Sequence, residues 1–324
     1  MPTHDQEKDE KGNSALIIAG PTACGKSAMA IDVAEHFNGT VINADSQQVY
    51  KELRVLSARP SIEDEKRVPH RLFGMMTGSE ICSAGHWVDL AVTEIKSTLD
   101  QGRLPILVGG TGMYLKSLTE GLSPIPEIPA HVRKQASSRH QELGTEAFHD
   151  EVNHLDPVSG ARLPVGDTQR LLRAWEVSIF TGRAFSSWQD EPRILPLPDV
   201  RFATIAITPP RDELYAAIDA RFLRMVDEGA LDEIKALEAL GFRADLPLMK
   251  ALGVPQLLDY VAGDVPLEDA ITQAQKLSRN YAKRQLTWVR NQIEDAYRLD
   301  AQYSKRFSGE IFSFIHEFLL TPEA

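Results

Sequence analysis

The sequence predicts an α/β fold, in which a parallel β-sheet is covered by helices on its faces. Short apolar segments typical of buried strands alternate with segments of helical periodicity, and this alternation indicates such a sheet. Two of these segments run into glycine-rich turns, so functional groups should gather at the carboxyl ends of the strands. The candidate strands are Ala15–Ala19, Thr40–Ala44, Leu104–Val108 and Phe202–Ile207.

Length and composition are those of a globular protein with a sizeable core. The chain has 324 residues, of which 43% are hydrophobic and 25% charged. It has no apolar run long enough for a transmembrane helix, and residues 1–13 lack the apolar segment of a secretory signal, so we expect a disordered tail there and no membrane association. Two cysteines cannot build a disulfide framework, which favours a reducing cytoplasm.

The first candidate strand leads into GPTACGKS, residues 20–27, which has the spacing of a phosphate-binding loop. A helix over Ser27–Phe37 should follow it. Backbone amides of such a loop and the helix N-terminus point at anionic oxygen atoms. Lys26 adds a positive charge, and Ser27 can coordinate Mg²⁺. Because a diphosphate group offers the same oxygens as ATP, the loop alone does not decide which of them it binds.

Polar residues follow the second and third candidate strands. In INADSQQVY, residues 42–50, Asp45 could position a magnesium ion or act as a general base. The amide side chains of Gln47 and Gln48 beside it could pair with the edge of a nucleobase. In LPILVGGTGMYLK, residues 104–116, a glycine loop would present the Thr111 hydroxyl at the start of a helix. A helix ending before Gly102 precedes this strand.

Two proline-rich stretches, residues 123–129 and 195–198, enclose about seventy residues without a convincing strand. Helices are expected there over His131–Leu143, Thr145–Asn153 and Asp167–Phe180. We therefore divide the chain into an α/β core, residues 14–122 and 200–324, and a helical insertion, residues 123–199. The C-terminal part should be helical over Arg211–Leu240, Pro247–Val261, Leu267–Ile293 and Lys305–Leu319.

Positive charge is concentrated in KLSRNYAKRQLTWVR, residues 276–290, which has five basic residues and no acidic one although the whole chain has a net charge of −11. A basic helix face with interleaved aromatic residues suits a nucleic-acid backbone. Arg170 and Arg173, three residues apart, would share a face of the helix in the insertion. For both groups the alternative is an ordinary solvated helix face.

Several motifs in this order resemble those of the bacterial tRNA dimethylallyltransferase family from about residue 15 to residue 300. They are the phosphate loop, DSQQVY (45–50), VPH (68–70), GGTGMY (109–114), DTQR (167–170) and AKRQLTW (282–288). The resemblance implies a nucleoside-kinase-like P-loop core with a helical insertion that holds the anticodon arm of tRNA. This chain departs from the family pattern at Cys24, where serine is usual, and at Ala217, where arginine is frequent.

The resemblance also implies a reaction. A dimethylallyl group would pass from dimethylallyl diphosphate to the exocyclic amine of the adenosine just 3′ of the anticodon, in tRNAs that read codons beginning with U. Diphosphate would be released, Mg²⁺ would assist, and the enzyme would act as a cytoplasmic monomer. Asp45 would be the general base, and Thr111 would contact the target nucleotide.

The site residues implied by the resemblance form two groups. The donor would be bound by Gly20, Pro21, Thr22, Ala23, Cys24, Gly25, Lys26, Ser27 and Arg211, with Ser27 on the metal. The tRNA would be bound by Asp45, Ser46, Gln47, Gln48, Thr111, Arg133, Gln169, Arg170, Leu171, Leu172, Arg173, Lys283 and Arg284.

Two other functions compete with this interpretation. A small-molecule kinase would explain the phosphate loop and the α/β core, but it leaves the insertion and the basic segment 276–290 without a role. A non-enzymatic, nucleotide-gated RNA-binding switch predicts nucleotide affinity without turnover.

Overall fold

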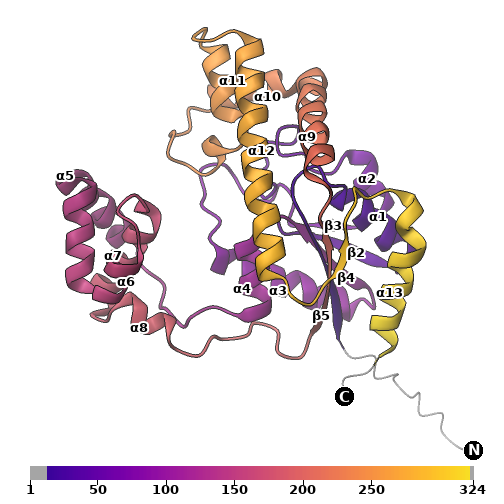
Figure 1. Ribbon diagram of the computed structural model, residues 1–324, viewed down its shortest axis with the longest axis horizontal. Coiled ribbons are helices and arrows are strands. Elements are labelled where there is room, and N and C mark those ends of the chain that lie inside the picture. The colour runs from indigo at the N-terminus through magenta and orange to yellow at the C-terminus, as the bar shows by residue number, and fades with distance from the viewer. Residues whose placement is uncertain (1–12, 322–324) are drawn as a thin grey trace, which may run out of the picture. The chain divides into compact units, whose positions relative to one another are not determined.

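The sheet of the computed structural model, which describes residues 13–321, is six-stranded and parallel (Figure 1). Its strand order is β3-β2-β4-β1-β5-β6, and every pairing within it is parallel. The α/β class predicted from the sequence is therefore confirmed. The strands are β1 (Ser14–Ala19), β2 (Gly39–Asn43), β3 (His70–Arg71), β4 (Leu104–Gly109), β5 (Arg201–Ile207) and β6 (Tyr297–Leu299).

Helices cover both faces of this sheet, which is why the central strands are apolar throughout. In β1, Ile17 packs into one hydrophobic cluster, whereas Leu16 and Ile18 pack into the other. The first cluster includes residues of α3 (Ala84–Asp100), α4 (Gly112–Glu120), α10 (Leu231–Ala239) and α11 (Val254–Val261). The second includes α1 (Lys26–His36) and α13 (Ser308–Leu320).

Two helices contribute to both clusters, α9 (Arg211–Met225) and α12 (Leu267–Gln292). In α12, Ala270 and Ala274 belong to the first cluster, and Ala282 and Leu286 belong to the second. Side chains of these two helices therefore pack into both parts of the hydrophobic core. Within residues 13–321, no helix has the length and apolar character needed to cross a membrane.

The described chain divides into two compact units. The core unit comprises residues 13–119 and 197–321, and the insertion unit comprises Glu120–Pro196, so the boundaries lie three residues before those expected. The insertion unit has its own core, which includes the buried side chains of Phe148 and Trp175. Its helices are α5 (Ala130–Leu155), α6 (Pro157–Arg162), α7 (Thr168–Thr181) and α8 (Phe185–Gln189).

Several elements differ from those expected. The single helix predicted over Arg211–Leu240 is wrong, because Gly229 takes a φ of 108° and separates α9 from α10. The helix expected over Pro247–Val261 is a short 3₁₀ turn followed by α11. The two helices expected over 131–153 form α5, interrupted at Gly144. The predicted disordered tail lies outside the described residues except for Asn13, whose carbonyl accepts a hydrogen bond from Arg201.

Candidate active site

The phosphate loop joins β1 to α1 and presents the N-terminus of that helix to a cavity. Gly25 precedes the helix with a φ of 95°, a conformation that residues with a side chain rarely adopt. The Lys26 ammonium donates a hydrogen bond to the carbonyl oxygen of Pro21 at 2.6 Å, across the loop. Residues Thr22 to Ser27 line the cavity. The loop therefore has the geometry with which helix N-termini bind anions.

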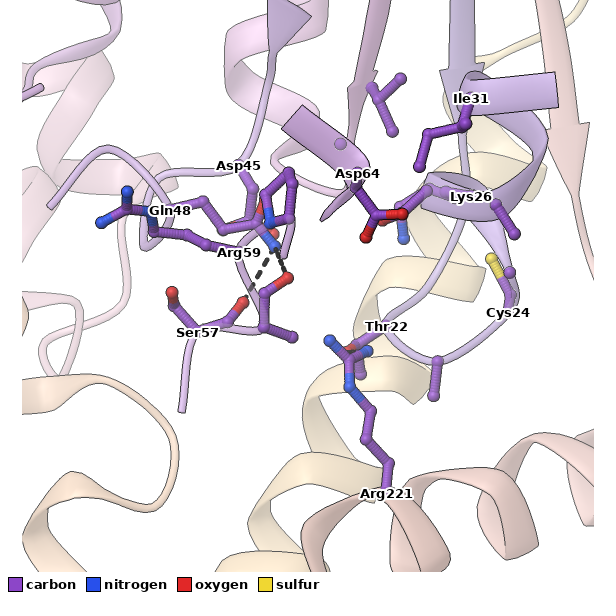
Figure 2. A pocket seen from close by; sticks show the side chains of 18 of the residues that line it. Thr22, Cys24, Lys26, Ile31, Asp45, Gln48, Ser57, Arg59, Asp64 and Arg221 are labelled. Carbon is purple, nitrogen blue, oxygen red and sulfur yellow. Dashed lines mark hydrogen bonds between the residues drawn. The ribbon is translucent and has the colours of Figure 1, made fainter. Parts of the chain in front are cut away.

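Asp45 follows β2 and lines the same cavity (Figure 2). Its orientation comes from a local turn, in which the Asp45 amide donates to Asn43 Oδ1 at 2.8 Å and the Gln47 amide donates to Asp45 Oδ1 at 2.9 Å. Among the described residues, none donates a hydrogen bond to the second carboxylate oxygen of Asp45. One oxygen thus holds the side chain in place, and the other is available to accept a proton.

Thr111, in the glycine loop after β4, connects that loop to the turn of Asp45. Its Oγ1 accepts a hydrogen bond from the Ser46 amide at 2.9 Å, and its own amide donates to Ala44 at 3.3 Å. The structure therefore brings together Asp45, Ser46 and Thr111, which come from two different strand ends, as the sequence motifs predicted.

The cavity has a volume of about 520 Å³ and carries an excess of positive charge. Its lining includes two carboxylates, Asp45 and Asp64. The four basic side chains that line it are those of Lys26, Arg59, Arg221 and Arg224. Figure 2 shows Arg59 and Arg221 reaching into this space from different segments. A surplus of cations around a partly enclosed volume attracts a multiply charged anion.

The arginine that helix α9 supplies to this cavity is not the one predicted. Arg211 is exposed at the first residue of α9 and does not line the cavity, whereas Arg221 and Arg224 do. Ten residues of helix separate Arg211 from Arg221 by about 15 Å, which explains the difference. Arg221 donates to Thr22 Oγ1 at 3.2 Å. Burial lowers the pKa of its guanidinium, and the nearby charge of Asp45 opposes that shift.

Helix α12 joins the two glycine loops through Gln285, a residue that the sequence interpretation missed. The buried Gln285 side chain accepts from the Thr22 amide at 2.8 Å and donates to the Gly110 carbonyl at 3.1 Å. One turn earlier, Tyr281 is hydrogen-bonded to Thr111 and Gln285. Burial, and then the charge of Asp45, raises the pKa of Tyr281 to about 12, so its hydroxyl stays protonated at neutral pH.

The two glutamines predicted to contact a nucleobase differ in what they can offer. The Gln48 amide nitrogen already donates to the carbonyls of Ser57 at 2.9 Å and Ala58 at 3.1 Å. The Oε1 atom of Gln47 is buried and accepts no hydrogen bond from the described residues. Gln47 therefore has the acceptor that a ligand could satisfy.

Six of the expected tRNA-binding residues lie in the insertion unit, five of them on helix α7 and one on α5. Gln169 and Arg170 are exposed near the start of α7, and Arg133 is exposed on α5. Leu171, however, is fully buried in the core of the insertion unit, and its side chain cannot reach RNA. Leu172 packs against the same core. The side chain of Leu171 therefore cannot supply the expected tRNA contact and instead stabilises the helix that carries the arginines, whereas the contact expected at the partly exposed Leu172 stays a prediction.

The remaining arginines and lysines of the predicted RNA surface differ in exposure. Arg173 is half-buried and lies 3.7 Å from the carboxylate of Glu176. On α12, Lys283 and Arg284 are exposed, and the Arg284 guanidinium lies 5.6 Å from the centre of the Tyr281 ring. Arg279 of the same helix is instead paired with Asp219.

A parallel sheet, a phosphate loop and a basic cavity at the carboxyl ends of the strands define an α/β protein of the phosphate-loop class. The model of the IPP transferase family matches residues 48–292. The chain belongs to this family.

Named relatives and solved structures extend over nearly the whole chain. A tRNA dimethylallyltransferase of Rhodospirillum centenum is 56% identical over 88% of this chain and 91% of its own. One of Paramagnetospirillum magneticum is 46% identical over 95% and 97%. The crystal structure of a tRNA isopentenylpyrophosphate transferase from Bacillus halodurans is similar with a TM-score of 0.68 and 33% identity, covering 95% of this chain and 97% of that one.

Proposed function

We propose that this chain transfers a dimethylallyl group from dimethylallyl diphosphate to the exocyclic amine of an adenosine in tRNA and releases diphosphate. Family membership and the names of the relatives support this reaction. The observation that carries it is the cavity itself, in which the phosphate loop and the Asp45 carboxylate line one space. A diphosphate leaving group and a proton acceptor can therefore act on the same reacting centre.

The donor half of this site consists of the phosphate loop and the cations around it. As the bond between the allylic carbon and the diphosphate oxygen breaks, negative charge builds up on the diphosphate. The loop amides, Lys26 and Arg221 stabilise that charge. Mg²⁺ fits this cavity because hydroxyl and carboxylate oxygens line it, and Ser27 would hold the ion. The bound ion would supply further neutralisation of the diphosphate.

The acceptor half consists of Asp45 and the residues that orient it. An aromatic amine is a poor nucleophile until its proton is removed, and the free oxygen of Asp45 accepts that proton. Thr111 and Gln47 then contact the target base, which must leave its stack to reach the cavity. The target is the adenosine next to the anticodon, on its 3′ side, in tRNAs that read codons beginning with U.

A mixing experiment with labelled substrates tests this function. Dimethylallyl diphosphate labelled in the prenyl group, or ATP labelled in its γ-phosphate, is incubated with the enzyme, with and without tRNA. Prenyl label should enter tRNA, and no label should pass from ATP to an acceptor. Phosphate transfer from ATP without prenyl transfer would instead identify a kinase, and ATP binding without any transfer would identify a nucleotide-gated RNA-binding protein.

A further inference from the structure

The residues at 53–60, here called the cavity loop, form part of the wall of the donor cavity. Ser57, Ala58, Arg59 and Pro60 line that cavity. Three consecutive backbone amides of the same loop bind a residue of helix α10 that does not line the cavity. The amides of Val55 and Leu56 donate to the two carboxylate oxygens of Glu233, each at 2.9 Å, and the amide of Arg54 also donates to Glu233.

The cavity loop is closed on itself between these two sides. The Ala58 amide donates to the carbonyl of Val55 at 2.9 Å, and the Arg59 amide donates to the carbonyl of Arg54 at 3.0 Å. On the cavity side, Gln48 donates to two carbonyls of the loop, as the dashed lines in Figure 2 show. Two side chains thus hold the loop. Glu233 accepts hydrogen bonds from its amides, and Gln48 donates hydrogen bonds to its carbonyls.

Arg59 belongs to this loop through its backbone, and its side chain is held by two further carbonyls. Its guanidinium donates to the carbonyls of Tyr50 and Lys51, both at 3.3 Å, and it lines the cavity. Its Nε atom is buried without a hydrogen-bond partner among the described residues. Burial, and then the charge of Arg54, lowers the pKa of the Arg59 guanidinium. Burying a cation without a full set of partners costs free energy, and an anion bound in the cavity would offset that cost.

We propose that Glu233 is a positioning residue for the prenyl donor: it holds the cavity loop so that Ser57 and Arg59 stay at the wall of the diphosphate site. Glu233 itself does not line the cavity, so its effect on the donor passes through the three loop amides. Three amides converging on one carboxylate form charge-assisted hydrogen bonds, which are stronger than neutral ones. This inference rests on the proposed donor site.

The test is Glu233→Gln, with inorganic pyrophosphate and dimethylallyl diphosphate as probes. Glutamine keeps the shape, but it turns an NH₂ group toward amides that need acceptors. We expect pyrophosphate affinity to fall about tenfold, because at least one partly buried amide is left unpaired. The affinity for tRNA should not change, and hydrogen exchange of residues 53–60 should accelerate while that of β1 stays slow. Glu238→Gln, at an exposed position of the same helix, is the matched control and should behave as wild type.

Each outcome decides the inference. Wild-type pyrophosphate affinity and unchanged loop exchange in Glu233→Gln would overturn it. If that variant does not fold, Glu233→Asp keeps the charge on a shorter side chain and should lose several-fold in pyrophosphate affinity while the chain still folds; an unaltered affinity would again overturn the role. If the wild-type chain binds no pyrophosphate, the proposed donor site is wrong as well. If it binds pyrophosphate and substitution of Glu233 does not change the affinity, only this inference is wrong.

Discussion

Lys26 shows how one side chain of the phosphate loop can be tested apart from the fold. Within residues 13–321, its ammonium donates a hydrogen bond to the loop carbonyl of Pro21 alone, and it lines the cavity, so Lys26→Ala should leave stability nearly unchanged. Loss of a charge-assisted contact costs roughly 1.5–3 kcal/mol, so the donor should bind about ten- to over a hundredfold more weakly. Equilibrium binding of dimethylallyl diphosphate measures this, with the exposed Lys96→Ala as control. Equal affinities would mean that Lys26 does not meet the diphosphate.

Asp45 is the residue at which two chemical roles can be separated. As general base, it must accept a proton from the adenine amine as the carbon–nitrogen bond forms. Asp45→Asn can still accept the hydrogen bond from the Gln47 amide, so the turn should persist, but it cannot take up the proton. The single-turnover rate of prenyl transfer should therefore fall by roughly 10²–10⁴, with little change in either substrate affinity.

A magnesium titration of the same variant distinguishes a base from a metal ligand. If Asp45 held Mg²⁺, raising the concentration of the ion would restore much of the rate of Asp45→Asn. We expect the rate to stay low at every concentration of the ion. The turn that holds the carboxylate is bonded to Thr111 and Gln47, which we expect to contact the target base and so to place its amine beside Asp45. A rate near that of wild type at high Mg²⁺ would refute the general-base role.

At the scale of elements, the strongest local patterns were predicted and the weakest were not. The four strands predicted from apolar runs correspond to β1, β2, β4 and β5 within one residue at each end. The edge strands β3 and β6 have two and three residues, too few for an apolar pattern to mark them. Gly229 was overlooked as a helix break because glycine within a helical pattern is often tolerated.

The candidate site residues divide in the same way: those in local motifs after strands were predicted, and those that depend on packing were not. Lys26, Asp45 and Thr111 belong to short motifs that directly follow strands, so the sequence was enough to make them candidates; their roles in the reaction stay predictions. Gln285 and Arg221 act on the phosphate loop from helices more than 190 residues away in the chain, and their contacts arise only from the packing of α9 and α12. Gln285 stands within the AKRQLTW motif (282–288), but the motif alone does not show that its side chain reaches the loop, and Arg221 lies in none of the motifs.

Asp156 supports a prediction about the helices of the insertion unit. Its buried carboxylate accepts hydrogen bonds from the amides and hydroxyls of Ser159 in α6 and Ser186 in α8, and thereby holds the starts of both helices. Asp156→Asn should destabilise this unit by about 1–3 kcal/mol, since buried donors lose an acceptor. Hydrogen exchange of α6 and α8 in the whole chain measures this, with β1 as internal control.

The effect of Asp156 should depend on pH in a defined direction. Burial tends to raise the pKa of this carboxyl, but the hydrogen bonds from Ser159 and Ser186 together hold it below its ordinary value. A lowered pKa means that the contribution to stability is fully present above the pKa of the unfolded chain, about 3.9, and is lost as the pH falls through the lower folded value. The difference between wild type and Asp156→Asn should therefore be constant near neutral pH and shrink below about pH 4. A difference that grows on acidification would contradict this.

At the scale of the whole molecule, the distribution of charge matters more than its sum. A net charge of −11 would repel RNA from most of the surface, so binding should depend on local groups of cations. Lys283 and Arg284 on α12 form one such group in the core unit, and Arg133, Arg170 and Arg173 provide another in the insertion unit. Both units should then contribute to tRNA affinity through phosphate contacts, with little effect on the donor.

The salt dependence of tRNA binding tests whether these cations meet phosphates. Each phosphate contact releases condensed counterions, so its loss should flatten the slope of log affinity against log salt by up to roughly 0.9. We expect Arg284→Ala and Arg173→Ala each to weaken tRNA binding and to reduce that slope, and to leave pyrophosphate affinity as it is. Arg243→Ala removes an arginine that is paired with Asp245 on the core unit and should change neither quantity. If Arg284→Ala and Arg173→Ala keep the wild-type slope, the two arginines belong to ordinary solvated helix faces and tRNA binds elsewhere.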